Sequence, residues 1–296
     1  MRNFEVLFDD SESSPVDDAA YAPYGKLGFP VPPADRPWVY SNFVQSLDGI
    51  VSFRGFHASG ADISQSAEDR WLMDLLRAHA DAVLTGVNTL IDETNLRGKE
   101  KRGPVFRIMD PEMRALRRKL GRAREKNIFV TGSGNLDLSA YRCFDGEHVD
   151  AIVVTTKAGA GRLEGSARNP GVPVVVAGER EAVDLPRMVE ALGRDFGIRY
   201  LLCEGGPTLY ASMSRAGLID EKFLTIAPVE VGQFVPDQQA RTPEELANPK
   251  YMTVRPTVFF GPGFTKETAS RWRWLSSRRI GDHEFNRHRV VRPSAT

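Results

Sequence analysis

The sequence has few of the residues that stabilise a protein without a large core or anchor it in a membrane. Two of its 296 residues are cysteine, Cys143 and Cys203. Two thiols cannot form a disulfide framework or a four-thiolate zinc site, so a reducing compartment is expected. No apolar run reaches the roughly 18 residues of a membrane span. The start, MRNFEVLFDD, lacks the basic segment and apolar stretch of a secretory signal. We therefore expect a cytoplasmic protein without membrane contact.

The chain also lacks an excess of either charge. It has 39 basic and 39 acidic residues, which gives a net charge of zero. Nucleic-acid binders usually carry a basic excess, so nucleic acid is not the expected partner. The acids are concentrated at the start, where residues 1–18 hold six of them against Arg2. Such a segment is typical of a flexible, solvated arm.

Several catalytic signatures are missing. The five histidines have no metal-ligand spacing, and no HExxH motif occurs, so no metal site is expected. The chain has neither a GxxxxGK[ST] phosphate loop nor a GxSxG nucleophile motif. Gly159 and Gly161 follow a predicted strand, but position 164 is glutamate, so the third glycine of a Rossmann fingerprint is absent. Hydride chemistry carried by a cofactor therefore fits better than hydrolysis.

Strand and helix patterns alternate through the middle of the chain, which predicts one α/β domain with a mixed, mostly parallel sheet flanked by helices. Residues 20–37 are punctuated by proline and glycine. We expect an N-terminal arm over residues 1–36, flexible at its start, and the domain over 37–292. Strands are predicted at 38–46, 81–86, 128–131, 151–156, 173–177, 198–204 and 220–231. Helices are predicted at 66–79, within 111–126, at 185–196 and at 205–218, and a closing hairpin at 271–291 around Gly281-Asp282.

The segment CEGGPTL, residues 203–209, indicates an anion site. A buried strand would deliver Glu204 to its C-terminal end, and Gly205 and Gly206 would let the backbone approach a ligand closely. Pro207 suits a first helical turn, and Thr208 adds a hydroxyl group. Free N–H groups at such a helix start bind phosphate or pyrophosphate. The alternative is a turn that needs glycine for steric reasons alone.

Two further predicted strand ends are followed by small polar residues that could bind an anion. In TGVNTLIDE, Gly86 ends a strand, Thr89 opens the next turn, and Asp92 belongs to a carboxylate pair. In FVTGSGNLD, Thr131 and Ser133 could line a phosphate or a ribose. A capped connector and an ordinary Gly-Ser turn are the respective alternatives. Because ligands of open α/β sheets lie at the C-terminal strand ends, we expect the three loops to form one site.

Two charged residues are open to more than one interpretation. Arg77, near the end of the first long helix, could hold a substrate phosphate or be a solvated cation. Asp48 could donate a proton, but Asp48-Gly49 between two strand-like runs more strongly predicts a hairpin turn.

Four segments, in this order, resemble the RibD C-terminal family, the pyrimidine reductases of riboflavin biosynthesis. They are SNFVQSLDG (41–49), LLRAHADAVLTGVNT (75–89), LCEGGPTL (202–209) and GLIDEKFLTIAPVEVG (217–232). The resemblance implies a dihydrofolate-reductase-like fold, usually a homodimer, that uses NADPH. It also implies reduction of the ribosyl group of a ribosylaminopyrimidine 5′-phosphate, a small-molecule substrate, to ribityl.

The resemblance also implies roles for individual residues. Glu204 and Arg77 match substrate positions, and Leu96, with Arg97 or Lys99, falls near the substrate phosphate. Glu204 is the expected catalytic residue, which orients the sugar or moves its proton, with Asp48 as a second candidate. The expected NADPH contacts are Val44, Gly86, Thr89, Asp92, Thr131, Ser133, Gly205, Gly206, Pro207, Thr208 and Leu209.

The family's Asp-Asp-Pro-x-Leu-Thr segment differs here. It reads Asp92-Glu93-Thr94-Asn95-Leu96-Arg97, without the proline. A reductase of the same fold that acts on a pterin or another dihydrofolate-like heterocycle is therefore a second hypothesis. A non-catalytic binding or RNA-contacting protein that uses the basic stretches 114–126 and 271–292 is a third. The zinc-deaminase motifs are absent, so the chain is not expected to deaminate its own substrate.

Overall fold

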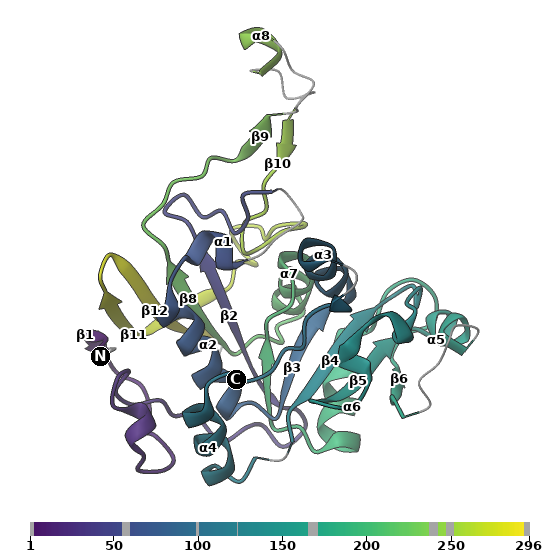
Figure 1. The fold of residues 1–296 in the computed structure, drawn as a ribbon, viewed down its shortest axis with the longest axis horizontal. Helices are drawn as coiled ribbons and strands as arrows, with labels where there is room; N and C mark the ends of the chain where they lie inside the picture. Colours follow the sequence, from purple (N-terminus) through teal and green to yellow (C-terminus); the bar gives the residue numbers. More distant parts are fainter. Residues whose placement is uncertain are drawn as a thin grey trace.

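The described part of the chain folds around one large β-sheet. The computed structural model describes residues 3–54, 60–98, 101–122, 124–164, 171–236, 242–246 and 252–292. Among these residues, ten strands form a single sheet (Figure 1). From one edge to the other they are β1 (Glu5–Asp9), β11 (Arg271–Ile280), β12 (His283–Val291), β8 (Glu221–Ile226), β2 (Trp38–Gln45), β7 (Tyr200–Cys203), β3 (Ala82–Gly86), β4 (Lys126–Thr131), β5 (Asp150–Thr155) and β6 (Val174–Val176).

The sheet is mixed and mostly parallel, as the sequence predicted. All neighbouring strands from β8 to β6 run parallel. Strands β12, β11 and β1 continue the sheet antiparallel beyond β8. The hairpin of β11 and β12 turns around Gly281-Asp282, where it was predicted. A separate pair, β9 (Phe234–Pro236) and β10 (Met252–Val254), projects from the body of the molecule (Figure 1).

Helices cover both faces of this sheet (Figure 1). Tyr40 of β2 packs in one core with Leu75 of α2, whereas Val39 packs in a second core with Met213 of α7. The two cores lie on opposite faces because successive side chains of a strand alternate. The helices are α1 (Gly60–Ser64), α2 (Ala67–His79), α3 (Val87–Arg97), α4 (Pro111–Lys119), α5 (Lys157–Glu164), α6 (Leu185–Phe196), α7 (Pro207–Arg215) and α8 (Pro243–Leu246), with short 3-10 turns at Ala19–Tyr21, Leu138–Ala140 and Arg142–Phe144.

Local signals correctly placed two of the long helices. The Ser66 hydroxyl caps α2 by accepting hydrogen bonds from the backbone N–H groups of Glu68 and Asp69, each at 3.2 Å. Helix α6 ends at Gly197, which has a φ of +64°, a left-handed conformation that favours glycine. Both helix boundaries follow from short-range backbone chemistry.

The predicted hairpin at Asp48-Gly49 is wrong, although the turn exists. Strand β2 ends at Gln45, and the Ser46 N–H donates to the carbonyl of Ile50 at 2.9 Å. Residues after the turn do not form a strand against β2. Ile50 forms an isolated antiparallel bridge with Thr257 instead. The second half of the expected hairpin is therefore paired with a distant part of the chain.

The acidic start forms an edge strand and is not a flexible arm, which corrects a second prediction. Strand β1 pairs antiparallel with β11. Phe4 is buried and its ring contacts Trp71 of α2, with 5.7 Å between the ring centroids. The Asp9 carboxylate accepts a 2.6 Å hydrogen bond from Arg278, whose side chain is fully buried. Carboxylates of the first residues thus neutralise buried arginines of the C-terminal hairpin.

Candidate active site

The C-terminal ends of the parallel strands are uneven beside β7. Ser41 of β2 and Leu84 of β3 are both register partners of Cys203, the last residue of β7. Strand β2 continues to Gln45, so it extends beyond the end of β7. Glu204 follows Cys203, and its N–H donates to the Leu84 carbonyl at 3.0 Å. Glu204 therefore lies where β7 stops short of its longer neighbours β2 and β3, and we call this step in the strand ends the recess.

Glu204 is held by Arg77 in a two-pronged ion pair. Arg77 Nε donates to Glu204 Oε1 at 2.8 Å, and Nη2 donates to Oε2 at 2.6 Å. The side chains are only 4% and 7% exposed. Burial alone would lower the pKa of Arg77, but the negative charge and hydrogen bonds of Glu204 raise it above its ordinary value. The paired geometry fixes the position and orientation of the Glu204 carboxylate.

The remaining contacts of Arg77 also lie within the protein. Its Nη1 donates to the carbonyl of Arg107 at 2.8 Å and lies 3.8 Å from the carboxylate of Asp74. Arg77 is therefore not a solvated cation. Because all three guanidinium nitrogens have protein partners, the structure places Arg77 as a support for Glu204.

Two helices begin side by side at the edge of this recess. Gly86 precedes α3 and Gly206 precedes α7, and neither helix start has a hydrogen bond from a capping side chain. A β-carbon on Gly206 would lie 3.0 Å from the Thr89 hydroxyl oxygen, so the two starts are in close contact. Each start presents unpaired N–H groups and the positive end of its dipole. Together they form an edge that is suited to an anion, and contacts of Gly86, Thr89 and Gly206 with a cofactor stay predictions.

The neighbours of Gly206 complete this edge. A β-carbon on Gly205 would lie 2.8 Å from the Leu209 side chain, so glycine is required there. Pro207 is the first residue of α7, where its missing N–H costs no hydrogen bond. Thr208 is exposed in the same first turn. Val44, on the neighbouring strand β2, is buried.

The loop after β4 is explained largely by its own packing. The buried Thr131 hydroxyl accepts the N–H of Gly134 at 3.1 Å. A β-carbon on Gly134 would lie 2.1 Å from the carbonyl oxygen of Gly159. The glycines of this loop and of α5 therefore allow close approach, and Gly159 is a packing glycine. Ser133 is exposed, and its hydroxyl accepts the N–H of Asn135 at 3.2 Å.

The predicted substrate residues of α3 line a small cavity near the recess. The cavity has a volume of about 230 Å³ and is bordered by Leu96 and Arg97, together with Arg54, Asp62 and Glu93. Arg97 pairs with Glu93 at 3.1 Å, and Arg54 lies 3.9 Å from Asp62. The sequence had not pointed to Arg54 or Asp62. Asp92 is half-buried on α3, and Lys99 lies outside the described residues.

Asp48 holds a loop rather than facing the recess as an acid. Its carboxylate accepts hydrogen bonds from the Ser46 hydroxyl and from the N–H groups of Val231 and Gly232, at 2.5, 3.1 and 2.6 Å. Burial would raise the pKa of Asp48, but these hydrogen bonds lower it below its ordinary value. A carboxyl group that stays ionised is a poor proton donor. These contacts give Asp48 a structural role at the turn, and its catalytic role stays a prediction.

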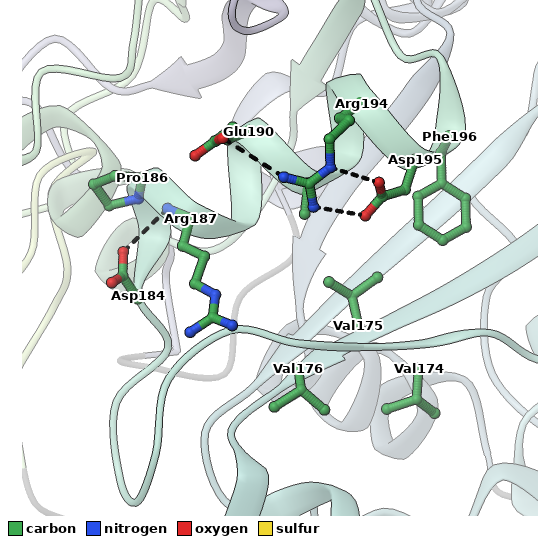
Figure 2. A pocket seen from close by; sticks show the side chains of 11 residues that line it. Val174, Val175, Val176, Asp184, Pro186, Arg187, Glu190, Arg194, Asp195 and Phe196 are labelled. Atoms are coloured by element: carbon green, nitrogen blue, oxygen red, sulfur yellow. Dashed lines mark hydrogen bonds and ion pairs between the residues drawn. The ribbon is translucent and has the colours of Figure 1, made fainter.

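A larger cavity lies away from this site. It has a volume of about 720 Å³ and lies between edge strand β6 and helix α6 (Figure 2). Arg194 in its wall is paired with Asp195 and Glu190 (Figure 2). None of the predicted site residues borders it.

The described residues contain no group of three or more histidine, cysteine, aspartate or glutamate side chains that could hold a metal ion. Within the same ranges, no helix is long and apolar enough to cross a membrane.

The fold and site define an α/β protein that presents a buried carboxylate beside two helix starts without capping side chains. Residues 37–281 match the RibD C-terminal domain, and the chain belongs to that family. It is 30% identical over 201 residues to the 2,5-diamino-6-ribosylamino-4(3H)-pyrimidinone 5′-phosphate reductase of Archaeoglobus fulgidus, covering 67% of this chain and 83% of the relative. The reductase of the same name from Methanothermobacter thermautotrophicus is 30% identical over 197 residues, covering 67% and 80%.

Solved structures agree on the fold. A pyrimidine reductase-like protein from Corynebacterium diphtheriae superimposes with a TM-score of 0.63 at 23% identity, covering 88% of this chain and 94% of the other. Acinetobacter baumannii RibD gives a TM-score of 0.59 at 20% identity over 88% of this chain. This chain spans 59% of the length of that RibD.

Proposed function

We propose that this protein is a reductase of the riboflavin-biosynthesis type. It reduces the ribosyl group of a ribosylaminopyrimidine 5′-phosphate to ribityl, with NADPH as the reductant. The observation that carries the proposal is the buried Arg77–Glu204 pair beside the two helix starts. The names of the two archaeal relatives, both pyrimidinone 5′-phosphate reductases, support the same substrate class.

The residues at the anion-binding edge fit a dinucleotide cofactor. The N–H groups that open α3 and α7 would hold its pyrophosphate, because both helices start at glycine without a capping side chain. Substituents larger than hydrogen at Gly206 would crowd the Thr89 hydroxyl. NADPH supplies a hydride when it is bound. Ser133 and Asp92 are proposed as further contacts on the basis of the family resemblance.

Glu204 would position the sugar. The open-chain or iminium form of the ribosylamine accepts hydride at C1′, and its hydroxyl groups are hydrogen-bond donors. The Glu204 carboxylate, oriented by Arg77 at the floor of the recess, can accept such hydrogen bonds and relay a sugar proton. Leu96 and Arg97 line the neighbouring cavity, where they can contact the phosphate end of the substrate.

We also infer from the family resemblance that the protein acts as a homodimer in the cytoplasm. Light scattering coupled to gel filtration tests the first inference. A mass of twice 32.9 kDa is expected, and a mass of one chain would contradict it.

The decisive experiment is NADPH oxidation by the purified protein. The substrates are the ribosylaminopyrimidine 5′-phosphate in its deaminated and non-deaminated forms, with dihydrofolate and a dihydropterin as comparisons. Turnover of either pyrimidine supports the proposal and shows whether reduction precedes deamination. Turnover of a pterin or dihydrofolate alone would replace the proposed substrate while retaining the reductase. Failure to bind NADPH would overturn the proposal itself.

A further inference from the structure

Arg70 is a charged residue beside the recess that the family resemblance does not assign. It is the fourth residue of α2, and its side chain is exposed. We propose that Arg70 binds the phosphate group of the substrate. The inference rests on the proposed function, because it assigns one end of the same substrate.

Helix geometry places Arg70 on the stripe of α2 that faces the recess. Arg70, Asp74 and Arg77 are spaced i, i+4 and i+7, so they share one helix face. Arg77 contacts Glu204 at the recess floor. Seven residues of helix rise about 10 Å, which separates the backbones of Arg70 and Arg77 by that length.

The direction of α2 puts Arg70 toward the mouth of the recess. Only Ala80 and Asp81 separate the end of α2 from the start of β3, and β3 runs toward the strand ends. Helix α2 therefore runs in the opposite direction, and its N-terminal turns lie nearer the open edge than Arg77 does. Helical side chains also lean toward the N-terminus, which carries the Arg70 guanidinium further outward. A phosphosugar with its reacting carbon near Glu204 can extend its phosphate along this face.

The pairing of charges singles out Arg70. Arg77 is paired with Glu204, Arg97 with Glu93, and Arg54 with Asp62. Arg70 makes no side-chain hydrogen bond or ion pair with any residue that the structure describes. Partial burial, and then the positive charge of Arg77, lower the pKa of Arg70 below its ordinary value, although the negative charges of Asp74 and Glu204 act to raise it. Arg70 thus lies near charges of both signs but pairs directly with none of the described carboxylates.

A phosphate dianion would supply the missing counter-charge. The guanidinium fork can donate two parallel hydrogen bonds to phosphate oxygens, which lysine cannot reproduce. Arg97 is close enough to add to the positive potential at Arg70. A phosphate between them would reduce the repulsion of these like charges, and the Arg97–Glu93 pair could remain intact.

The test compares Arg70→Gln with wild type on the ribosylaminopyrimidine 5′-phosphate and on its dephosphorylated form. We expect the KM of the phosphorylated substrate to rise about 10- to 100-fold with kcat within about twofold, because the lost contact is present in ground and transition states alike. The dephosphorylated substrate should show the same kcat/KM with both proteins. Arg70→Lys should lie between them. Arg118→Gln, which removes an exposed arginine of α4, is the matched control.

An unchanged KM in Arg70→Gln would overturn the inference, and so would an equal loss on both substrates. Ribose 5-phosphate binding, measured by calorimetry, gives a readout without turnover. Wild type and Arg118→Gln should bind it, and Arg70→Gln should bind it at least about tenfold more weakly. If wild type binds ribose 5-phosphate through Arg70 but reduces no pyrimidine, the proposed function fails and the phosphate site stands. If wild type turns over and Arg70→Gln behaves identically, only the phosphate site fails.

Discussion

Replacing Arg77 with methionine tests whether the Arg77–Glu204 pair organises the site. Methionine keeps an unbranched chain but removes the charge and all donors. Glu204, 7% exposed, would lose both of its arginine hydrogen bonds. Asp74, 3% exposed and 3.8 Å away, would lose its nearest cation. Two buried carboxylates would then have no positive partner.

The expected cost follows from that arrangement. Removal of one partner from a buried ion pair typically costs about 3–5 kcal/mol. We expect the upper part of that range, because Asp74 is affected as well. Since folded domains are stable by about 5–15 kcal/mol, Arg77→Met should still fold but lose about a third or more of its stability. Urea unfolding followed by tryptophan fluorescence measures the change, and NADPH oxidation should fall at least about tenfold.

The double variant Arg77→Met/Glu204→Leu separates charge from packing. Replacement of a whole buried pair by apolar groups is often neutral or stabilising, so the double variant should recover about 2 kcal/mol or more relative to Arg77→Met. It should stay inactive, because the carboxylate is gone. The reasoning is refuted if Arg77→Met costs less than about 1 kcal/mol, or if the double variant is no more stable than the single one.

Three further predictions concern single residues. Glu204→Gln should lower turnover at least about tenfold at saturating NADPH, and unchanged turnover would remove Glu204 from the mechanism. Thr208→Asp should weaken NADPH binding in a fluorescence titration, because it places a negative charge at the start of α7; equal affinity would argue against this anion site. Burial lowers the pKa of His79 to about 3. Between pH 6.5 and 4.5 the unfolded chain therefore binds a proton at His79, and the folded chain does not. His79 should therefore cost about 2–3 kcal/mol of stability between pH 6.5 and 4.5, a loss that His79→Gln should not show in urea titrations at both pH values.

Elements defined by short-range chemistry could be predicted from the sequence. Helix α2 starts where Ser66 can cap it, and α6 ends where Gly197 can adopt a positive φ. Strand β1 could not be predicted in this way. Its acidic residues are typical of a solvated segment, and its partner β11 lies more than 260 residues away in the sequence. Only the buried Arg278 explains why Asp9 belongs inside the fold.

The loops of the site could also be located, because Gly86 and Gly206 mark strand-to-helix turns whatever they bind. Ion pairs between side chains far apart in the chain could not be predicted from the sequence. Arg77 and Glu204 are 127 positions apart, and both interpretations of Arg77 assumed a cation without a protein partner. The structure shows that the partner is the predicted catalytic carboxylate itself.

The charge spacing of α2 nevertheless draws attention to Arg70. Arg70, Asp74 and Arg77 recur at helical spacing, so one face of α2 must carry two positive charges and one negative charge. Asp74 does not pair with Arg70: its Oδ1 lies 3.8 Å from Arg77 Nη1, and its Oδ2 accepts the N–H groups of Met109 and Asp110, each at 2.9 Å. With Glu204 paired to Arg77, Arg70 has no direct ion-pair partner on this face among the described residues. The spacing of charges on the helix, combined with one long-range ion pair, therefore supports the proposed phosphate contact of Arg70.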